Sequence, residues 1–186
     1  MNTRIDFDKL KIGISIFLIG FFMPLKAQND DFSRQHFPNQ STELKKAQKN
    51  IQKGDAYYYL ETRGGYGQAL EYYLPANHFN PSNALLNYKL GVCYLMSFHK
   101  NMALSYLEKA RKLDSLVDPK LMFHLGMAFQ FHSRYREARA CYEAYRRSLD
   151  QTSLLAEGTL IEKRLQECAS GTALSARPNI VRFANL

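Results

Sequence analysis

LGVCY at residues 90–94 is repeated as LGMAF at residues 125–129, which lies 35 positions further along the chain. The same offset separates Ala103 from Ala138, so the similarity extends well beyond the two pentapeptides. A period close to 34 residues with fixed glycine, aromatic and alanine positions is typical of a repeated helix-turn-helix unit. One such unit cannot bury its apolar stripe alone and must stack on a neighbour. The repetition therefore predicts an all-α solenoid.

The residue types at the repeated positions follow from the way helices pack. Gly91 and Gly126 allow the two helices of one unit to approach closely, where a Cβ atom would clash. Leu107 and Tyr142 occupy matching positions in the second helix of each unit and fill the space between helices. Apolar residues also recur at three- and four-residue spacing, as an amphipathic helix requires.

A third, less regular copy lies upstream. Gly54 and Tyr57 hold the glycine and aromatic positions, and Ala69 and Tyr73 hold those of the second helix. The segment between the two helices is three residues longer than in the other copies, and GGYG at residues 64–67 is expected to form this longer turn. A phosphate-binding loop would need a preceding strand and a following Lys-Ser/Thr pair, which this segment lacks.

Pro75 falls inside the second helix of this first unit. Proline removes a backbone donor and crowds the carbonyl group four residues earlier, here that of Glu71. In a helix interior this costs about 3 kcal/mol. The sequence therefore predicts a kink or an early helix end at Pro75.

Residues 43–150 resemble the tetratricopeptide repeat, closely in the second and third units and partly in the first. The tryptophan usual in that family is absent, since Asn87 and Met122 stand at its position. The resemblance implies a short right-handed α-solenoid of about three helix-turn-helix repeats. A further amphipathic segment at residues 154–168 is expected to form a capping helix that ends at Gly171. Its expected buried face consists of Leu160, Ile161, Leu165 and Cys168.

Residues 50–73 and 87–94 resemble the amino-terminal repeats of a narrower family of periplasmic, outer-membrane-associated proteins. In that family the repeats precede a β-propeller and an OmpA-like peptidoglycan-binding domain, and some members serve type IX secretion and gliding. Residues 176–186 look like the segment that leads into the first propeller blade, and the sequence stops there at Leu186. The resemblance thus covers the helical region and not the part that would bind the cell wall.

The amino-terminal residues 1–27 have the pattern of a secretory signal peptide. Basic residues up to Lys11 precede an apolar run at 12–25, and Ala27 is a small residue at the expected cleavage position. The run is shorter than the roughly 20 residues of a membrane-spanning helix, although an uncleaved anchor is the alternative. We expect a periplasmic protein, in one option part of an outer-membrane complex, with no transmembrane span after signal removal.

The mature chain is expected to begin with a flexible leader at residues 28–42. The helical solenoid would follow at 43–170, and an extended tail at 171–186. The net charge of the whole chain is +8, and its basic residues are spread along the predicted helices. This spread favours solvated helix faces over a dedicated anion site, and the export signal argues against a nucleic-acid partner.

Cysteine, histidine and acidic residues give no sign of a metal or catalytic centre. Cys93, Cys141 and Cys168 are an odd number for an oxidising compartment, and buried free thiols are the main interpretation. A Cys141–Cys168 disulfide is the alternative. No Cys-x-x-Cys pair, catalytic motif or nucleotide-binding loop occurs. The sequence therefore predicts no enzyme activity, cofactor or metal.

In tetratricopeptide proteins the first helix of each unit lines a concave groove, and the resemblance implies the same here. The implied partner-binding residues are Tyr58, Tyr59, Tyr88, Val92, Leu95, Phe123, Met127 and Phe131. The subclass that grips carboxylates uses Lys and Asn at positions held here by Tyr88 and Val92, so that binding mode is not expected. An apolar groove suits an apolar peptide or helix, or else it is filled by residues 28–42 or the tail after Gly171.

These observations lead to two hypotheses about function. The first is a non-catalytic periplasmic scaffold for protein–protein interaction that binds a protein or peptide in the cell envelope, as in a secretion or motility complex. The alternative is a truncated envelope-anchoring protein whose missing carboxyl-terminal half bound peptidoglycan.

Overall fold

The computed structural model describes residues 31–175, and every regular element within that range is helical. The signal-peptide prediction and residues 176–186 fall outside the described residues. The elements are α1 (Ser41–Tyr58), α2 (Arg63–Phe79), α3 (Ala84–Met96), the 3-10 helix η2 (Lys100–Met102), α4 (Ala103–Leu113), α5 (Leu121–Phe131), α6 (Tyr135–Ser148) and α7 (Gln151–Ser175).

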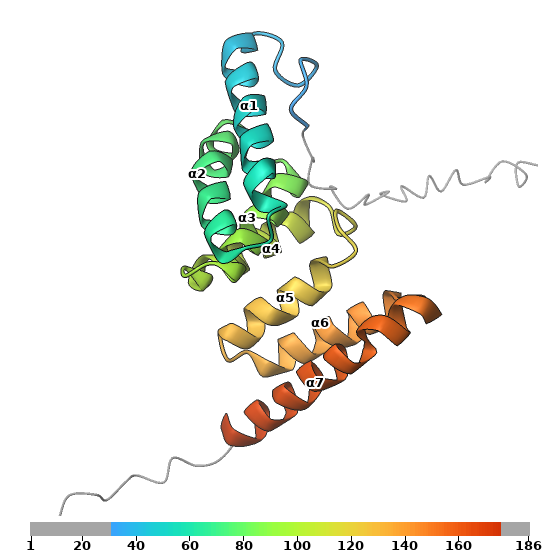
Figure 1. Cartoon of the computed structure of the whole chain (residues 1–186). Helices are drawn as coiled ribbons and strands as arrows, with labels where there is room; N and C mark the ends of the chain where they lie inside the picture. Colours follow the sequence, from blue (N-terminus) through green and yellow to red (C-terminus); the bar gives the residue numbers. More distant parts are fainter. Residues whose placement is uncertain (1–30, 176–186) are drawn as a thin grey trace, which may run out of the picture.

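Successive helices pack as antiparallel hairpins that stack in chain order. The pairs α1/α2, α3/α4 and α5/α6 each form a hairpin, and neighbouring hairpins meet through α2 with α3 and α4 with α5 (Figure 1). Helix α7 packs along α6 and covers that end of the stack. The all-α solenoid with a capping helix, predicted from the 35-residue repetition, is confirmed.

Each hairpin crosses at a glycine that faces a large side chain of the second helix. A Cβ atom added to the glycine would lie 2.5 to 2.6 Å from that side chain, well inside van der Waals contact. The pairs are Gly54 with Tyr73, Gly91 with Leu107, and Gly126 with Tyr142. The same crossing thus occurs in all three hairpins, including the irregular first one.

The glycine-rich segment 64–67 is not the turn that the sequence suggested. Helix α2 begins at Arg63, and the hydroxyl oxygen of Thr62 caps it by accepting a hydrogen bond from the Gly65 amide at 3.0 Å. A Cβ on Gly65 would lie 2.7 Å from the Tyr57 carbonyl oxygen, so glycine permits the close approach of α1 and α2. The left-handed turn residue is instead Glu61, with φ of 51°.

Helix α2 continues through Pro75 to Phe79, so the expectation that it would end early is wrong. Pro75 and Glu71 are both exposed to solvent. Water can therefore hydrate the Glu71 carbonyl that loses its helical partner, which lowers the cost of proline at this position.

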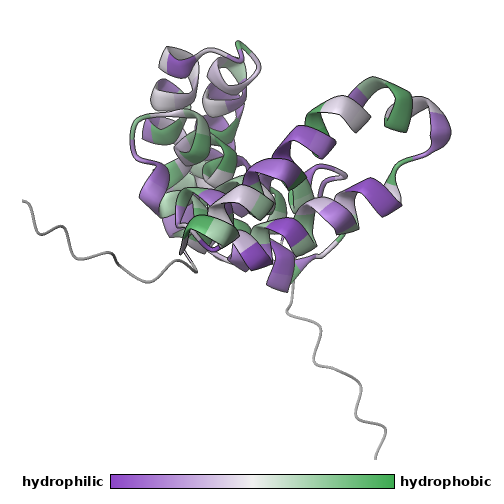
Figure 2. Cartoon of the chain, turned by 90° about the horizontal axis from the view of Figure 1, so that it is seen from below, coloured by the Kyte–Doolittle hydropathy of each residue, from purple (hydrophilic) through white to green (hydrophobic). Residues whose placement is uncertain are grey.

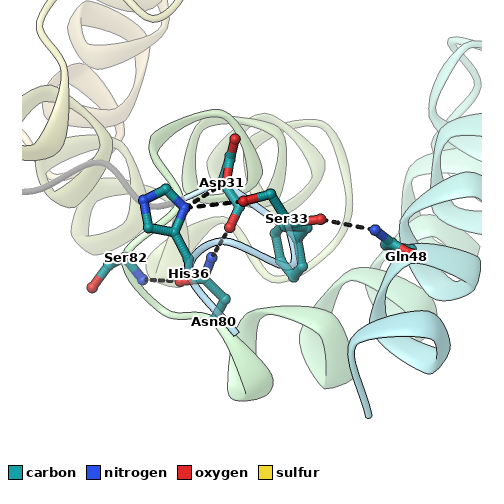
Figure 3. A network of polar contacts seen from close by, with 7 residues as sticks. Asp31, Ser33, His36, Gln48, Asn80 and Ser82 are labelled. Atoms are coloured by element: carbon teal, nitrogen blue, oxygen red, sulfur yellow. Dashed lines mark hydrogen bonds and ion pairs between the residues drawn. The ribbon is translucent and has the colours of Figure 1, made fainter. Parts of the chain in front are cut away.

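Residues 31–40 were expected to be a flexible leader, but they pack against the first hairpin. The Phe32 and Phe37 rings lie 6.3 and 4.7 Å from the Phe79 ring, measured between centroids. The Gln48 amide donates a hydrogen bond to the Phe32 carbonyl at 2.8 Å, and the Asn80 amide reaches the Asp31 carbonyl at 3.4 Å (Figure 3). Two aromatic side chains within six residues supply the apolar contact that holds this segment.

Helix α7 passes Gly171, where a helix end was expected, and continues to Ser175. A Cβ on Gly171 would lie 2.5 Å from the Tyr135 ring, so this glycine serves the contact between α7 and α6. The predicted buried face is partly correct, because Ile161 and Cys168 are fully buried, whereas Leu160 is exposed.

Buried apolar residues form two clusters between the stacked helices. One joins the first and second hairpins, and the other runs from the second hairpin to α7. Figure 2 shows apolar and polar segments alternating along the helices, as amphipathic helices require. Cys93, Cys141 and Cys168 are free and buried in these clusters, and no disulfide joins Cys141 to Cys168.

Candidate interaction surface

The residues predicted to bind a partner lie along the first helices of the hairpins. Tyr58 and Tyr59 end α1, and the others come from α3 and α5. Four of them are almost completely buried in the core, namely Tyr88, Val92, Leu95 and Phe123.

Tyr58 and Met127 are half-buried against the same core, whereas Tyr59 and Phe131 expose 67% and 51% of their surface. The neighbouring helices cover the buried positions. Residues 31–40, part of the segment that was expected as one possible filler of the groove, pack on Phe79 instead. Accessible apolar surface therefore remains at the ends of α1 and α5.

A buried ion pair connects the first two hairpins. Lys89 of α3 is 8% exposed, and its ammonium lies 2.6 Å from the Asp55 carboxylate of α1. The Tyr73 hydroxyl donates a hydrogen bond to the same oxygen, and burial together with this bond raises the pKa of Tyr73. The ammonium also lies 5.4 to 6.0 Å from the ring centroids of Tyr58, Tyr59 and Tyr73. These partners compensate for the desolvation of the lysine and fix the position of α3 against α1.

A second polar network connects the second and third hairpins. The Tyr88 hydroxyl donates a hydrogen bond to the Asp118 carboxylate at 2.7 Å and lies 3.0 Å from Nδ1 of His124. Because the tyrosine proton is directed to Asp118, Nδ1 of His124 carries the hydrogen and donates it to the tyrosine oxygen. Burial lowers the pKa of His124 to about 4, so this imidazole is neutral at pH 7.

A third network attaches α7 to the last hairpin. The Tyr142 hydroxyl donates to the Gln130 carbonyl oxygen at 2.8 Å, and the Gln130 amide donates to the Glu167 carboxylate at 2.8 Å. Arg164 donates to the same carboxylate at 3.0 Å. The polar side chains at the helix interfaces thus bind one another and hold the stack in a fixed geometry.

Exposed apolar side chains gather at the turns inside the hairpins, and only Tyr59 and Phe131 among them were predicted from the sequence. We call these turns and their flanking residues, 59–63, 97–102 and 131–136, the turn edge. Its large exposed apolar residues are Tyr59, Leu60, Phe98, Met102 and Phe131. A signal was present in the sequence, since large apolar residues are unusual at turns.

Residues 31–175 contain neither a candidate metal site nor a candidate membrane span. Within that range no three histidine, cysteine or acidic residues come together as metal ligands. No helix in the same range is both long and apolar enough to cross a bilayer.

No protein-family model matches this chain, and no curated protein is similar to it. The resemblance to tetratricopeptide proteins therefore depends on the repeated residues of the sequence.

Proposed function

We propose that this chain is a non-catalytic scaffold of the tetratricopeptide kind that binds a protein partner in the periplasm. The observation that carries the proposal is the recurrence of one hairpin crossing at Gly54, Gly91 and Gly126. Stacked identical hairpins form extended, rigid surfaces, and such surfaces commonly serve protein binding.

The buried polar groups support a scaffold role. The Asp55 carboxylate is bound by Lys89 and Tyr73, and the His124 imidazole by Tyr88. These titratable groups link helices to one another. Contacts within the protein account for these groups, so no substrate is needed to explain their positions.

The placement in the periplasm follows from the signal-peptide pattern at residues 1–27. Residues 50–73 and 87–94 resemble the repeats of envelope proteins, and this resemblance extends the proposal to a secretion or motility complex. Amino-terminal sequencing of the exported protein tests the location, because a mature chain that starts at Met1 contradicts signal cleavage.

Photo-crosslinking tests the scaffold itself. A photoreactive amino acid replaces one exposed side chain on each face: Tyr59 at the end of α1, Leu116 in the α4–α5 turn, or Leu155 on α7. In detergent-solubilised envelopes we expect a discrete protein adduct from one face and none from the others. Absence of a protein adduct at all three positions, with the variants folded and exported, would refute the proposal.

A further inference from the structure

The three turns of the turn edge lie along one side of the solenoid. The Arg63 guanidinium of the first turn lies 5.0 Å from the Phe98 ring centroid in the second turn. Helix η2 of the second turn contacts α5, whose end leads into the third turn. In Figure 1 the α3–α4 and α5–α6 turns lie on the left of the molecule, and the α4–α5 turn, which connects the second and third hairpins, lies on the right. The turn edge therefore combines residues from three separate hairpins.

The apolar side chains of the turn edge project outward. Phe98 is 79% exposed and Tyr59 is 67% exposed, and both follow directly after the last turn of a helix. Half of the ten large hydrophobic residues exposed among residues 31–175 lie on the turn edge. Single exposed apolar residues are normal on any protein, but a cluster of this size marks an interaction surface.

The charges differ between the two sides of the solenoid. On the turn edge the cations Arg63, Lys100, Arg134 and Arg136 accompany one acid, Glu61, although Arg134 also pairs with Glu137 at 2.9 Å. On the opposite side, in the turns at 80–83, 114–120 and 149–150, the charges are those of Asp114, Asp118, Asp150 and Lys120. The turn edge thus carries a net positive charge, whereas the turns on the other side are net acidic and have the basic residues Arg111, Lys112, Arg146 and Arg147 on the helix ends beside them.

We propose that the turn edge lies on an anionic lipid surface, with Tyr59, Leu60 and Phe98 inserted among the lipid headgroups. Aromatic side chains prefer the interface between headgroups and acyl chains, and nearby Lys and Arg residues are attracted to anionic headgroups. Side chains that project from turn tips can enter a lipid surface, whereas a peptide-binding site would enclose its ligand. The inference uses the envelope location of the proposed function but does not depend on its protein partner.

Flotation with lipid vesicles tests this binding. The chain from residue 28 retains every described helix, and it is mixed with vesicles of phosphatidylcholine alone or with phosphatidylglycerol added. We expect binding only to the anionic vesicles, and weaker binding at high salt because salt screens the charges.

Paired variants assign the binding to the turn edge. Phe98→Ala is expected to lower the partition coefficient about tenfold, which corresponds to loss of part of one buried aromatic ring. The matched control is Leu116→Ala, because Leu116 is 87% exposed but lies on the opposite side. Lys100→Gln is expected to lower it about fivefold, and Lys112→Gln in α4 is its control. Circular dichroism verifies that each variant is folded.

Two outcomes would overturn the proposal. The first is equal binding in either comparison: the Phe98 variant binds anionic vesicles as well as the Leu116 variant does, or the chain binds neutral vesicles as well as anionic ones. The second is a protein adduct from a photoreactive residue at position 98 in a chain that binds no vesicles, which would make the turn edge a protein interface and leave the scaffold proposal intact. Vesicle binding without a protein adduct from any face would instead remove the scaffold proposal and keep the lipid surface.

Discussion

Gly91→Ala should destabilise the protein, although alanine favours a helix more than glycine does. The added Cβ would lie 2.5 Å from Cγ of Leu107, 2.7 Å from its Cδ2 and 3.2 Å from its backbone nitrogen. Leu107 is fully buried. Because the backbone of α4 is also within reach, a change of side-chain rotamer cannot relieve the clash, and the two helices must move apart.

The expected magnitude is the difference of two effects. Overpacking a well-filled core costs about 1 to 3 kcal/mol, and this position belongs at the upper end because both side chain and backbone obstruct the new atom. Replacing glycine by alanine in a helix gains about 1 kcal/mol. The net loss is therefore about 2 kcal/mol, which lowers Tm by roughly 4 to 8 °C for a chain of this length.

Gly158→Ala is the matched control. Gly158 lies inside α7, and a Cβ there would meet only Leu154 at 3.8 Å, an ordinary contact. We expect this variant to gain about 1 kcal/mol from helix propensity alone. Urea denaturation followed by circular dichroism measures both variants. If Gly91→Ala raises stability as Gly158→Ala does, the close crossing that underlies the repeated hairpins is refuted.

Three further predictions concern buried polar and sulfur groups. Lys89→Met should cost about 3 kcal/mol, because it leaves the Asp55 carboxylate without its cation, whereas Lys112→Met at an exposed position should change little in urea denaturation. The pKa of His124 is about 4 in the folded protein, against 6.5 in the unfolded chain. As the pH falls, the unfolded chain therefore binds the proton first. About 3 kcal/mol of the free energy of unfolding should be lost between pH 6.5 and 4. His124→Gln should remove this part of the pH dependence of Tm, and His132→Gln should retain it. Burial raises the pKa of Cys93 to about 12 and that of Cys141 to about 11, so a thiol reagent should label neither in the native protein and all three cysteines after unfolding; rapid native labelling would contradict the buried positions.

The repetition in the sequence was sufficient to predict the hairpins and their order. Gly91 and Gly126 with their partners Leu107 and Tyr142 recur at one offset, and packing at a helix crossing restricts all four positions. Such a pattern reports contacts within a unit. It therefore also identified the first hairpin, in which the corresponding pair is separated by three more residues.

Local propensity failed where tertiary contacts dominate. Gly65 and Gly171 were interpreted as turn and stop signals, yet both lie inside helices, since each permits contact with a neighbouring residue, Tyr57 or Tyr135. A single glycine in a helix costs about 1 kcal/mol, which a buried contact of this kind can offset. The sequence at the position itself does not contain this information.

The sequence did not show that four of the predicted partner-binding residues, Tyr88, Val92, Leu95 and Phe123, are buried. Spacing assigns Tyr88 and Phe123 to one face of a helix, and it does not tell how closely the next hairpin approaches that face. Their burial depends on contacts with distant residues, such as Asp118 for Tyr88. Leu60 and Phe98 of the turn edge lie in turns outside the helical period, so an argument from periodicity could not find them, whereas Tyr59 and Phe131 were among the predicted residues.

The anchoring of residues 31–40 sets an order of events if Ala27 is the cleavage position. Three residues lie between it and Asp31, whose carbonyl is bound by Asn80. Fully extended, the four steps from Ala27 to Asp31 span roughly 14 Å, which leaves little chain for a peptidase to bind once Asp31 is held against Asn80. We expect removal of the signal peptide, residues 1–27, to come first. Packing of residues 31–40 over Phe79 would then be among the last steps of maturation.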